Sequence, residues 1–260
     1  MNDDIVVTEI EDGVATVTIN RPDRRNAMSN AVVDELTRRI SGLSDDEEAQ
    51  VVVLTGAGDK AFCAGGDLMD QGGGGGMLKM HEERGGFADL LIEMNRCKSP
   101  IVSRVNGHAL GGGLGLVLNS DIAVASTDAQ LGTPEVKVGL FPMMILSVIQ
   151  RNMGRKRAME MVLTGKKFEA EDAVEHGIVN YAVAPDELDE KVNELVEQIA
   201  GFSPAVLQMG RRAFYETQDM GFEEQLRTLH KDLTLNTLTE DAGEGVMAFI
   251  EKREPEWKGK

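Results

Sequence analysis

Apolar and polar residues alternate along residues 5–11 and again along residues 14–20, on either side of the Asp12-Gly13 pair. Alternation with a period of two predicts strands with one buried face, and an Asp-Gly pair favours the tight turn of a β-hairpin. We therefore expect the N-terminal segment to form two antiparallel strands.

The period then changes. Residues 30–43 carry apolar side chains at helical spacing, and Ser29 is placed to cap the first turn. Residues 51–55 are continuously apolar, which is typical of a strand buried on both faces. Residues 56–67 are rich in small side chains and predict a loop, and residues 77–97 predict a second helix. Strands that alternate with helices indicate an α/β fold.

The most informative stretch is 102–116, which predicts a strand, a turn and then three glycines, 111–113, at the start of an apolar helix. Glycines let the backbone approach a ligand closely, and the first N–H groups of a helix attract negative charge. This layout favours an oxyanion hole. Glycine-rich turns also bind dinucleotide phosphates, and Asp128 or Glu135 lies at roughly the distance where that motif places a ribose-binding acid.

After Pro142 the pattern is almost wholly helical. The predicted helices are 143–151, 155–163, 170–175, 188–199, 205–219, 222–238 and 240–251, with one short strand at 179–183. We divide the chain into a core, 1–200, and a helical C-terminal region, 201–260. The C-terminal helices have apolar stripes and no sheet to cover, so we expect them to pack on the core or on another subunit.

Composition narrows the function. The chain has 260 residues and a formal charge of −17, from 44 acidic against 27 basic residues, which argues against nucleic acid as the main partner. The acidic surplus suits a salt-rich cytoplasm, or it only keeps the protein soluble. Two cysteines, Cys63 and Cys97, give no disulfide framework, and no run approaches the ~20 apolar residues of a membrane span. We expect a cytoplasmic protein without membrane attachment.

Eight segments, in order along the chain, resemble the crotonase superfamily, the enoyl-CoA hydratase/isomerase group. They are 20–28, 60–67, 106–113, 121–122, 130–135, 159–165, 173–179 and 248–253. The resemblance implies an α/β fold built as a spiral of repeated ββα units, with a helical C-terminal trimerisation region. It also implies substrates that are thioesters of coenzyme A, no prosthetic group, and assembly as a homotrimer or a dimer of trimers. We expect no metal, since the sequence has no HExxH motif and no CxxC pair.

The same resemblance assigns the two oxyanion-hole donors to the backbone N–H groups of Gly66 and Gly112. It assigns contacts with coenzyme A to six residues, with Lys252 reaching a ligand on a neighbouring subunit: Arg24, Arg25, Ala61, Cys63, Ala64 and Lys252. Arg24 and Arg25 are alternatively solvated surface charges. Cys63 is interpreted as a small residue beside the adenine and not as a nucleophile, since no base near it in sequence would stabilise a thiolate.

The catalytic carboxylates depart from the hydratase pattern. Hydratases of this family place one glutamate two residues beyond the triple glycine and another after the Gly-x-Pro; here the second is Glu135 and the first position is Gly115. Hydration suits two carboxylates, whereas one base can shift a double bond. Met143 and Met144 are expected to line the acyl pocket beside Gly115, with flexible apolar bulk.

The sequence therefore favours an enoyl-CoA isomerase with Glu135 as its base. Enoyl-CoA hydration is the alternative within the class, followed by thioester hydrolysis or decarboxylation, and a non-catalytic CoA-binding subunit is the alternative from another class. We also expect the glycine run 72–76 to be a mobile lip of the acyl pocket, and His108 to serve packing more than proton transfer.

Overall fold

The computed structural model of the chain describes residues 4–67 and 76–260. A six-stranded sheet runs through its centre in the order β1-β2-β3-β5-β7-β10. These strands are β1 (Val6–Glu11), β2 (Val14–Ile19), β3 (Val51–Gly56), β5 (Ile101–Val105), β7 (Ile122–Ser126) and β10 (Tyr181–Val183). Only β1 and β2 pair antiparallel; the other neighbours in this sheet are parallel.

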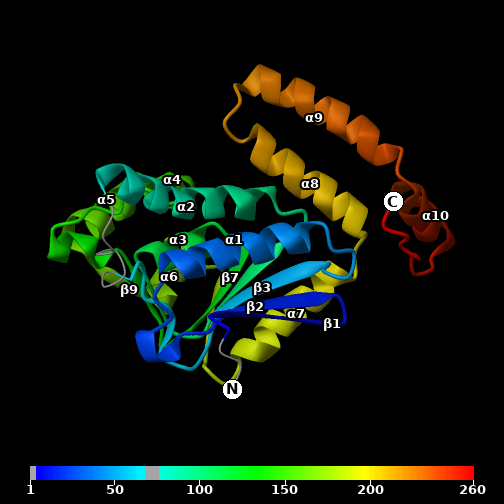
Figure 1. The fold of residues 1–260 in the computed structure, drawn as a ribbon. Coiled ribbons are helices and arrows are strands. Elements are labelled where there is room, and N and C mark those ends of the chain that lie inside the picture. Colours follow the sequence, from blue (N-terminus) through cyan, green and yellow to red (C-terminus); the bar gives the residue numbers. More distant parts are fainter. Residues whose placement is uncertain (1–3, 68–75) are drawn as a thin grey trace.

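Helices cover both faces of this sheet (Figure 1). On one face lie α1 (Asn30–Ser44), α2 (Met77–Arg96) and α3 (Gly112–Leu118), and on the other lies α7 (Leu188–Ala200). The apolar stripe of α7 packs against the outward-facing valines of β3, β5 and β7, and the larger core lies between the sheet and α1–α3. Because helices cover both faces of this sheet, the side chains on both faces of residues 51–55 are buried, which explains why this segment is continuously apolar.

A second, four-stranded sheet corrects two sequence predictions. Its strands are β4 (Ala61–Cys63), β6 (His108–Leu110), β8 (Gln130–Gly132) and β9 (Lys167–Glu169). The segment 56–67 is therefore not entirely loop, and the chain after Pro142 is not almost wholly helical. Three-residue strands are too short to show a period, and their partners are remote in sequence, so no local pattern marks them.

The two sheets together give the repeating unit. A long strand of the first sheet is followed by a short strand of the second and then by a helix, as in β3-β4-α2 and β5-β6-α3. The predicted α/β spiral of ββα units is confirmed. Because β4 pairs in parallel with β6, the turns that follow these two short strands lie side by side.

The remaining helices complete the chain. They are η1 (Pro22–Arg24), η3 (Pro134–Val138), α4 (Leu146–Asn152), α5 (Arg155–Thr164), α6 (Ala170–Glu175), α8 (Pro204–Thr217), α9 (Phe222–Thr237) and α10 (Glu240–Glu251). α4 begins three residues later than predicted, so Met143 lies outside the helix. In Figure 1, α9 and α10 extend away from the core, and several of their large apolar side chains are exposed, including Phe222 and Phe249.

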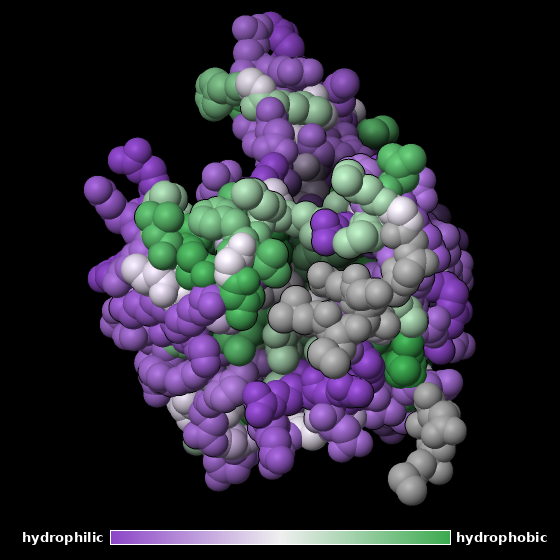
Figure 2. Space-filling view, turned by 60° about the vertical axis from the view of Figure 1, so that its left-hand side comes forward, coloured by the Kyte–Doolittle hydropathy of each residue, from purple (hydrophilic) through white to green (hydrophobic). Residues whose placement is uncertain are grey.

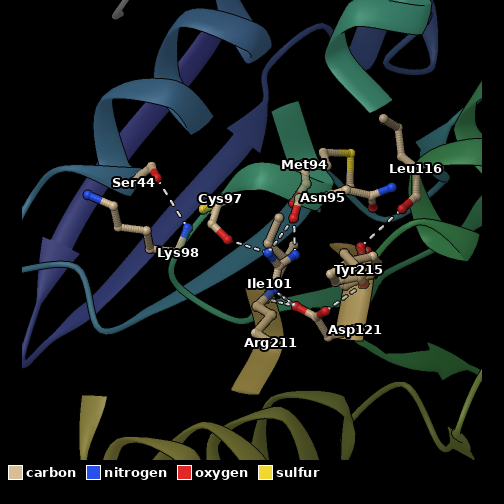
Figure 3. A network of polar contacts seen from close by, with 12 residues as sticks. Ser44, Met94, Asn95, Cys97, Lys98, Ile101, Leu116, Asp121, Arg211 and Tyr215 are labelled. Atoms are coloured by element: carbon tan, nitrogen blue, oxygen red, sulfur yellow. Dashed lines mark hydrogen bonds and ion pairs between the residues drawn. The ribbon is translucent and has the colours of Figure 1, made fainter. Parts of the chain in front are cut away.

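A buried arginine fastens α8 to the core (Figure 3). The guanidinium of Arg211 donates to Asp121 and to the carbonyl groups of Met94, Asn95 and Cys97, where α2 ends. The Tyr215 hydroxyl donates to the other oxygen of Asp121 at 2.7 Å. A guanidinium placed on the free carbonyl groups at a helix C-terminus satisfies acceptors that the helix itself leaves unpaired.

Local sequence signals at the N-terminus are confirmed. Asp12 and Gly13 have φ angles of 49° and 83°, the left-handed pair of a primed hairpin turn. The Ser29 hydroxyl accepts a hydrogen bond from the Val32 N–H at 3.3 Å and caps α1. Of the glycine run expected to be mobile, 72–75 lie outside the described residues. No helix in the described part of the chain is long and apolar enough to cross a membrane.

Candidate active site

A cavity of about 500 Å³ opens beside the N-terminus of α3. Its wall comes from α1, the turn after β4, the N-terminal half of α2, the start of α3, and the segment from η3 to Ile145. Exposed apolar side chains form part of its rim, among them Val138, Leu140 and Met143. Figure 2 shows hydrophobic residues gathered on this face of the molecule.

The first backbone donor is Gly66, in the turn after β4. Met28 N–H donates to the Gly65 carbonyl and Asp67 N–H donates to the Met28 carbonyl, both at 2.8 Å, so the segment forms an isolated parallel bridge. Successive N–H groups of an extended segment point to opposite sides. The Gly66 N–H therefore points away from Met28, and it donates to no acceptor in the described part of the chain.

The second donor is Gly112, the first residue of α3. Gly111, at φ +54°, turns the chain from β6 into the helix, and its N–H donates to the Gly132 carbonyl at 2.9 Å. Gly113 lies directly on the Cys63 carbonyl, so a Cβ there would overlap backbone. This close approach brings the Gly112 N–H into the same cavity as Gly66, and within residues 4–67 and 76–260 this helix-terminal N–H donates to no acceptor.

Glu135 supplies a carboxylate to this cavity. It lies in η3, and its Oε1 is 2.7 Å from the place where a Cβ on Gly111 would be, so the carboxylate lies directly against the glycine that turns the chain into α3. Its Oε2 is buried and has no hydrogen-bond partner within residues 4–67 and 76–260. Burial raises the pKa of Glu135 above its ordinary value, since the surroundings solvate the charged form poorly.

The sequence places Gly115 in the acyl pocket, but the structure places it behind the pocket wall. Gly115 is buried and is not among the cavity-lining residues, because the Ile145 side chain occupies the space a Cβ would need and Phe87 lies 3.4 Å from it. Met143 and Met144 line the cavity as expected and are 70% and 41% exposed. The corner where hydratases carry a second glutamate is therefore filled with apolar side chains.

Comparison with known proteins agrees with this geometry. Residues 9–260 match the family model described as enoyl-CoA hydratase/isomerase. The chain belongs to the enoyl-CoA hydratase/isomerase family. It is 34% identical to an (E)-benzylidenesuccinyl-CoA hydratase of Thauera aromatica, over 98% of this chain and 99% of that protein. It is 32% identical to a 2,3-dehydroadipyl-CoA hydratase of Escherichia coli, over 95% and 96%.

Solved structures of this family superimpose closely. An enoyl-CoA hydratase of Mycobacterium smegmatis matches with a TM-score of 0.95 and 35% identity, over 98% of this chain and 99% of that chain. The human enoyl coenzyme A hydratase domain-containing protein 3 matches with a TM-score of 0.93 and 29% identity, over 98% and 100%. The protein is thus an enzyme of the enoyl-CoA hydratase/isomerase family with the crotonase fold.

The residues that the family resemblance assigns to coenzyme A lie in different environments. Ala61 and Cys63 are buried, and burial raises the pKa of the Cys63 thiol to about 12, so that thiol stays protonated at neutral pH. Only their backbone could meet a ligand. Ala64 lines the cavity, and its N–H donates to the carbonyl of Arg25 at 3.1 Å.

The positively charged residues that the resemblance assigns to contacts with coenzyme A are exposed. Arg24 and Arg25 lie at the end of η1, next to the Ala64 turn. Lys252 follows α10, which lies at the far end of the C-terminal arm from α2 and α4 (Figure 1). Within one chain, Lys252 is therefore not part of the cavity that contains Glu135.

The sequence analysis did not identify the residues of α2 that line the cavity. Met80, Glu83, Arg84 and Phe87 all line the cavity, at the i, i+3, i+4, i+7 spacing of one helix face, and this spacing is the signal that could have revealed them. His108 has a structural contact, because its Nδ1 accepts a hydrogen bond from Gln130 N–H at 3.0 Å. The described residues contain no group of acidic, histidine or cysteine side chains that could hold a metal ion.

Proposed function

We propose that the protein is an enoyl-CoA isomerase that moves a double bond from the 3,4 to the 2,3 position, with Glu135 as the single base. The observation that carries this proposal is the pairing of a half-buried carboxylate, whose Oε2 is buried, with two backbone N–H groups that donate to no acceptor in the described residues, while the corner at Gly115 is filled by Ile145. One base and an oxyanion hole are sufficient for this reaction.

The proposed reaction begins with the thioester carbonyl oxygen between the Gly66 and Gly112 N–H groups. The Glu135 carboxylate removes a proton from C2, and the electron pair spreads through C2, C3 and C4 to the oxygen, giving a dienolate. The two N–H groups stabilise the oxygen as it gains charge. Glu135 then returns the proton to C4, which leaves the double bond between C2 and C3 and regenerates the carboxylate.

The surroundings of Glu135 support a base that works without water. Its raised pKa gives a carboxylate that is a stronger base than an exposed one. Phe87, Ile145 and Met144 form an apolar part of the cavity wall, and Ile145 and Phe87 fill the space beside Gly115 where a second carboxylate would stand. Exclusion of water also protects the dienolate from unwanted protonation.

Hydration of a 2-enoyl-CoA is the second candidate, and a specific observation favours it. Glu83 of α2 lines the same cavity, where it also approaches Lys79 at 3.7 Å, so a second carboxylate is available from a different element. Relatives of this chain carry the name hydratase. In that case Glu83 would take the role that the Gly115 position has in two-glutamate members.

A panel of 2-enoyl- and 3-enoyl-CoA thioesters tests these alternatives. Isomerisation of a 3-enoyl substrate brings the double bond into conjugation, so ultraviolet absorbance rises while the mass is unchanged. Hydration of a 2-enoyl substrate removes conjugation and adds the mass of one water. Hydration that is lost in Glu83→Gln, with no turnover of 3-enoyl substrates, would overturn the isomerase proposal.

We also propose that residues 201–260 mediate assembly into a homotrimer or a dimer of trimers. The exposed apolar side chains of α9 and α10, such as Leu233 and Phe249, support this arrangement, which would let Lys252 reach a neighbouring subunit's ligand. Light scattering at micromolar concentration tests it, and a monomeric mass would contradict it.

A further inference from the structure

The loop that connects β2 to α1 has an unusual backbone. Arg25 and Asn26 both have positive φ angles, 52° and 54°, which non-glycine residues adopt at a cost. The side chain of Asn26 is fully buried and offsets this cost: its Oδ1 accepts from Arg21 N–H, and its Nδ2 donates to the Ala57 and Ala61 carbonyls at 3.0 and 2.7 Å. The loop is therefore fastened to the start of β4.

Arg21 links this loop to the turn that contains Gly66. Its guanidinium donates from Nη1 to the Ala27 carbonyl at 2.6 Å and from Nη2 to Asp67 Oδ2 at 3.1 Å. The side chains of Arg21 and Asp67 are only 21% and 10% exposed, so this ion pair is poorly screened by solvent. A planar guanidinium with two bonds fixes direction as well as distance.

The position of these two bonds is informative. Ala27 and Asp67 are the residues directly next to the Met28–Gly66 bridge, one on each strand. Arg21 therefore braces both sides of the bridge, while the two backbone hydrogen bonds of Met28 hold Gly65 and Asp67. Together these contacts fix the orientation of the Gly66 peptide group, so that its N–H points into the cavity.

We propose that Arg21, acting through Asp67 and Ala27, is a positioning residue for the oxyanion hole. It touches no substrate atom; it fixes the direction of the Gly66 N–H, so its loss lowers the rate of enolate formation more than it weakens substrate binding. This rests on the proposed role of Gly66 as a donor. Displacement of a catalytic group by about 1 Å costs on the order of 100-fold in rate, and we expect a 10–100-fold loss of kcat in Arg21→Met.

The test compares Arg21→Met and Arg21→Lys with the wild type on whichever enoyl-CoA the enzyme turns over. Lysine keeps the charge but cannot make both bonds, so we expect an intermediate loss. KM should change less than kcat. Arg104→Met is the matched control, because Arg104 forms an ion pair with Asp189 of α7 on the opposite face of the sheet, and it should leave kcat unchanged.

A second readout does not depend on which reaction the enzyme catalyses. A bound 2,4-dienoyl-CoA absorbs at longer wavelength when N–H donors polarise its thioester carbonyl. We expect this red shift in the wild type and in Arg104→Met, and a reduced shift in Arg21→Met. A wild-type complex without the shift would overturn the oxyanion hole and the role of Arg21 together, whereas hydration in place of isomerisation would affect neither.

Thermal unfolding separates positioning from stability. Folded Arg21→Met with unchanged kcat and an unchanged red shift would overturn the proposal. If Arg21→Met does not fold, the same two measurements on Arg21→Lys decide the matter. In the double variant with Asp67→Asn, kcat losses that multiply would also contradict the proposal, since residues acting as one unit give losses that do not.

Discussion

The polar and apolar walls of the cavity are built by different means. On the polar side, backbone hydrogen bonds and glycines that allow close approach hold the turns at Gly66 and Gly112, and the Glu135 carboxylate lies against Gly111. On the apolar side, Phe87 and Ile145 fill the space beside Gly115 through packing alone. We therefore expect the polar wall to support enolate chemistry, and the packing of Ile145 and Phe87 to keep a carboxylate out of the Gly115 position.

The largest expected effect is on the polar wall. Replacing Glu135 with Gln keeps the shape but removes the base, so kcat for 3-enoyl-CoA should fall by about 10²–10⁴-fold while acyl-CoA binding stays nearly intact. Steady-state kinetics and equilibrium binding measure the two effects. Glu171→Gln, which alters an exposed carboxylate in α6, is the control and should change neither kcat nor acyl-CoA binding. Retention of most of the rate in Glu135→Gln would contradict the single-base mechanism.

The apolar wall can be tested by adding a second carboxylate. Gly115→Glu should destabilise the fold by about 1–3 kcal/mol or more, because the new side chain overlaps Ile145, and it should not gain hydration activity. The combined Gly115→Glu and Ile145→Ala variant provides space and should hydrate a 2-enoyl-CoA faster than Ile145→Ala alone. Thermal unfolding and product mass are the measurements. Efficient hydration by the single Gly115→Glu variant would show that Ile145 does not block this corner.

The pH dependence links the two walls. Burial raises the pKa of Glu135, and the base must be ionised to accept a proton, so kcat/KM should fall as pH decreases through a value above the ordinary 4.5 of this carboxyl. Below that pKa the rate should drop about tenfold per pH unit. A pH–rate profile with isomerase substrate measures the acid limb. An acid limb at or below the ordinary value would mean that the apolar wall does not affect the base.

The smallest effect is expected at the rim. Met143 and Met144 line the cavity as flexible apolar side chains. Replacing either with Ser should therefore lower kcat/KM more for substrates with long acyl groups than for those with short ones. Loss of one buried methylene-sized contact is worth about 0.8 kcal/mol, or roughly fourfold in kcat/KM. The kcat/KM values for acyl chains of increasing length measure it. Equal losses for all lengths would indicate that the acyl group does not lie along this rim.

Local sequence signals predicted much of the fold. The hairpin at Asp12-Gly13, the cap at Ser29 and the apolar run 51–55 depend on turn chemistry, one hydrogen bond and a residue period, all of which lie within a few residues. β4, β8 and β9 were missed because each has three residues and pairs with strands far away in sequence. Their stability comes from the second sheet as a whole, which no short window contains.

The candidate site also combines features that local sequence specifies with features that only the folded chain creates. The sequence by itself determined the glycine cluster 111–113, which favours an oxyanion hole, and its resemblance to the family assigned the proposed donors Gly66 and Gly112 and the proposed base Glu135. Only the tertiary structure decided that Ile145 closes the corner at Gly115, that Glu83 faces the cavity, and that Arg21 braces the bridge beside Gly66. The physical reason is that filled space and ion pairs join side chains separated by tens of residues, and their contact exists only after the chain has folded.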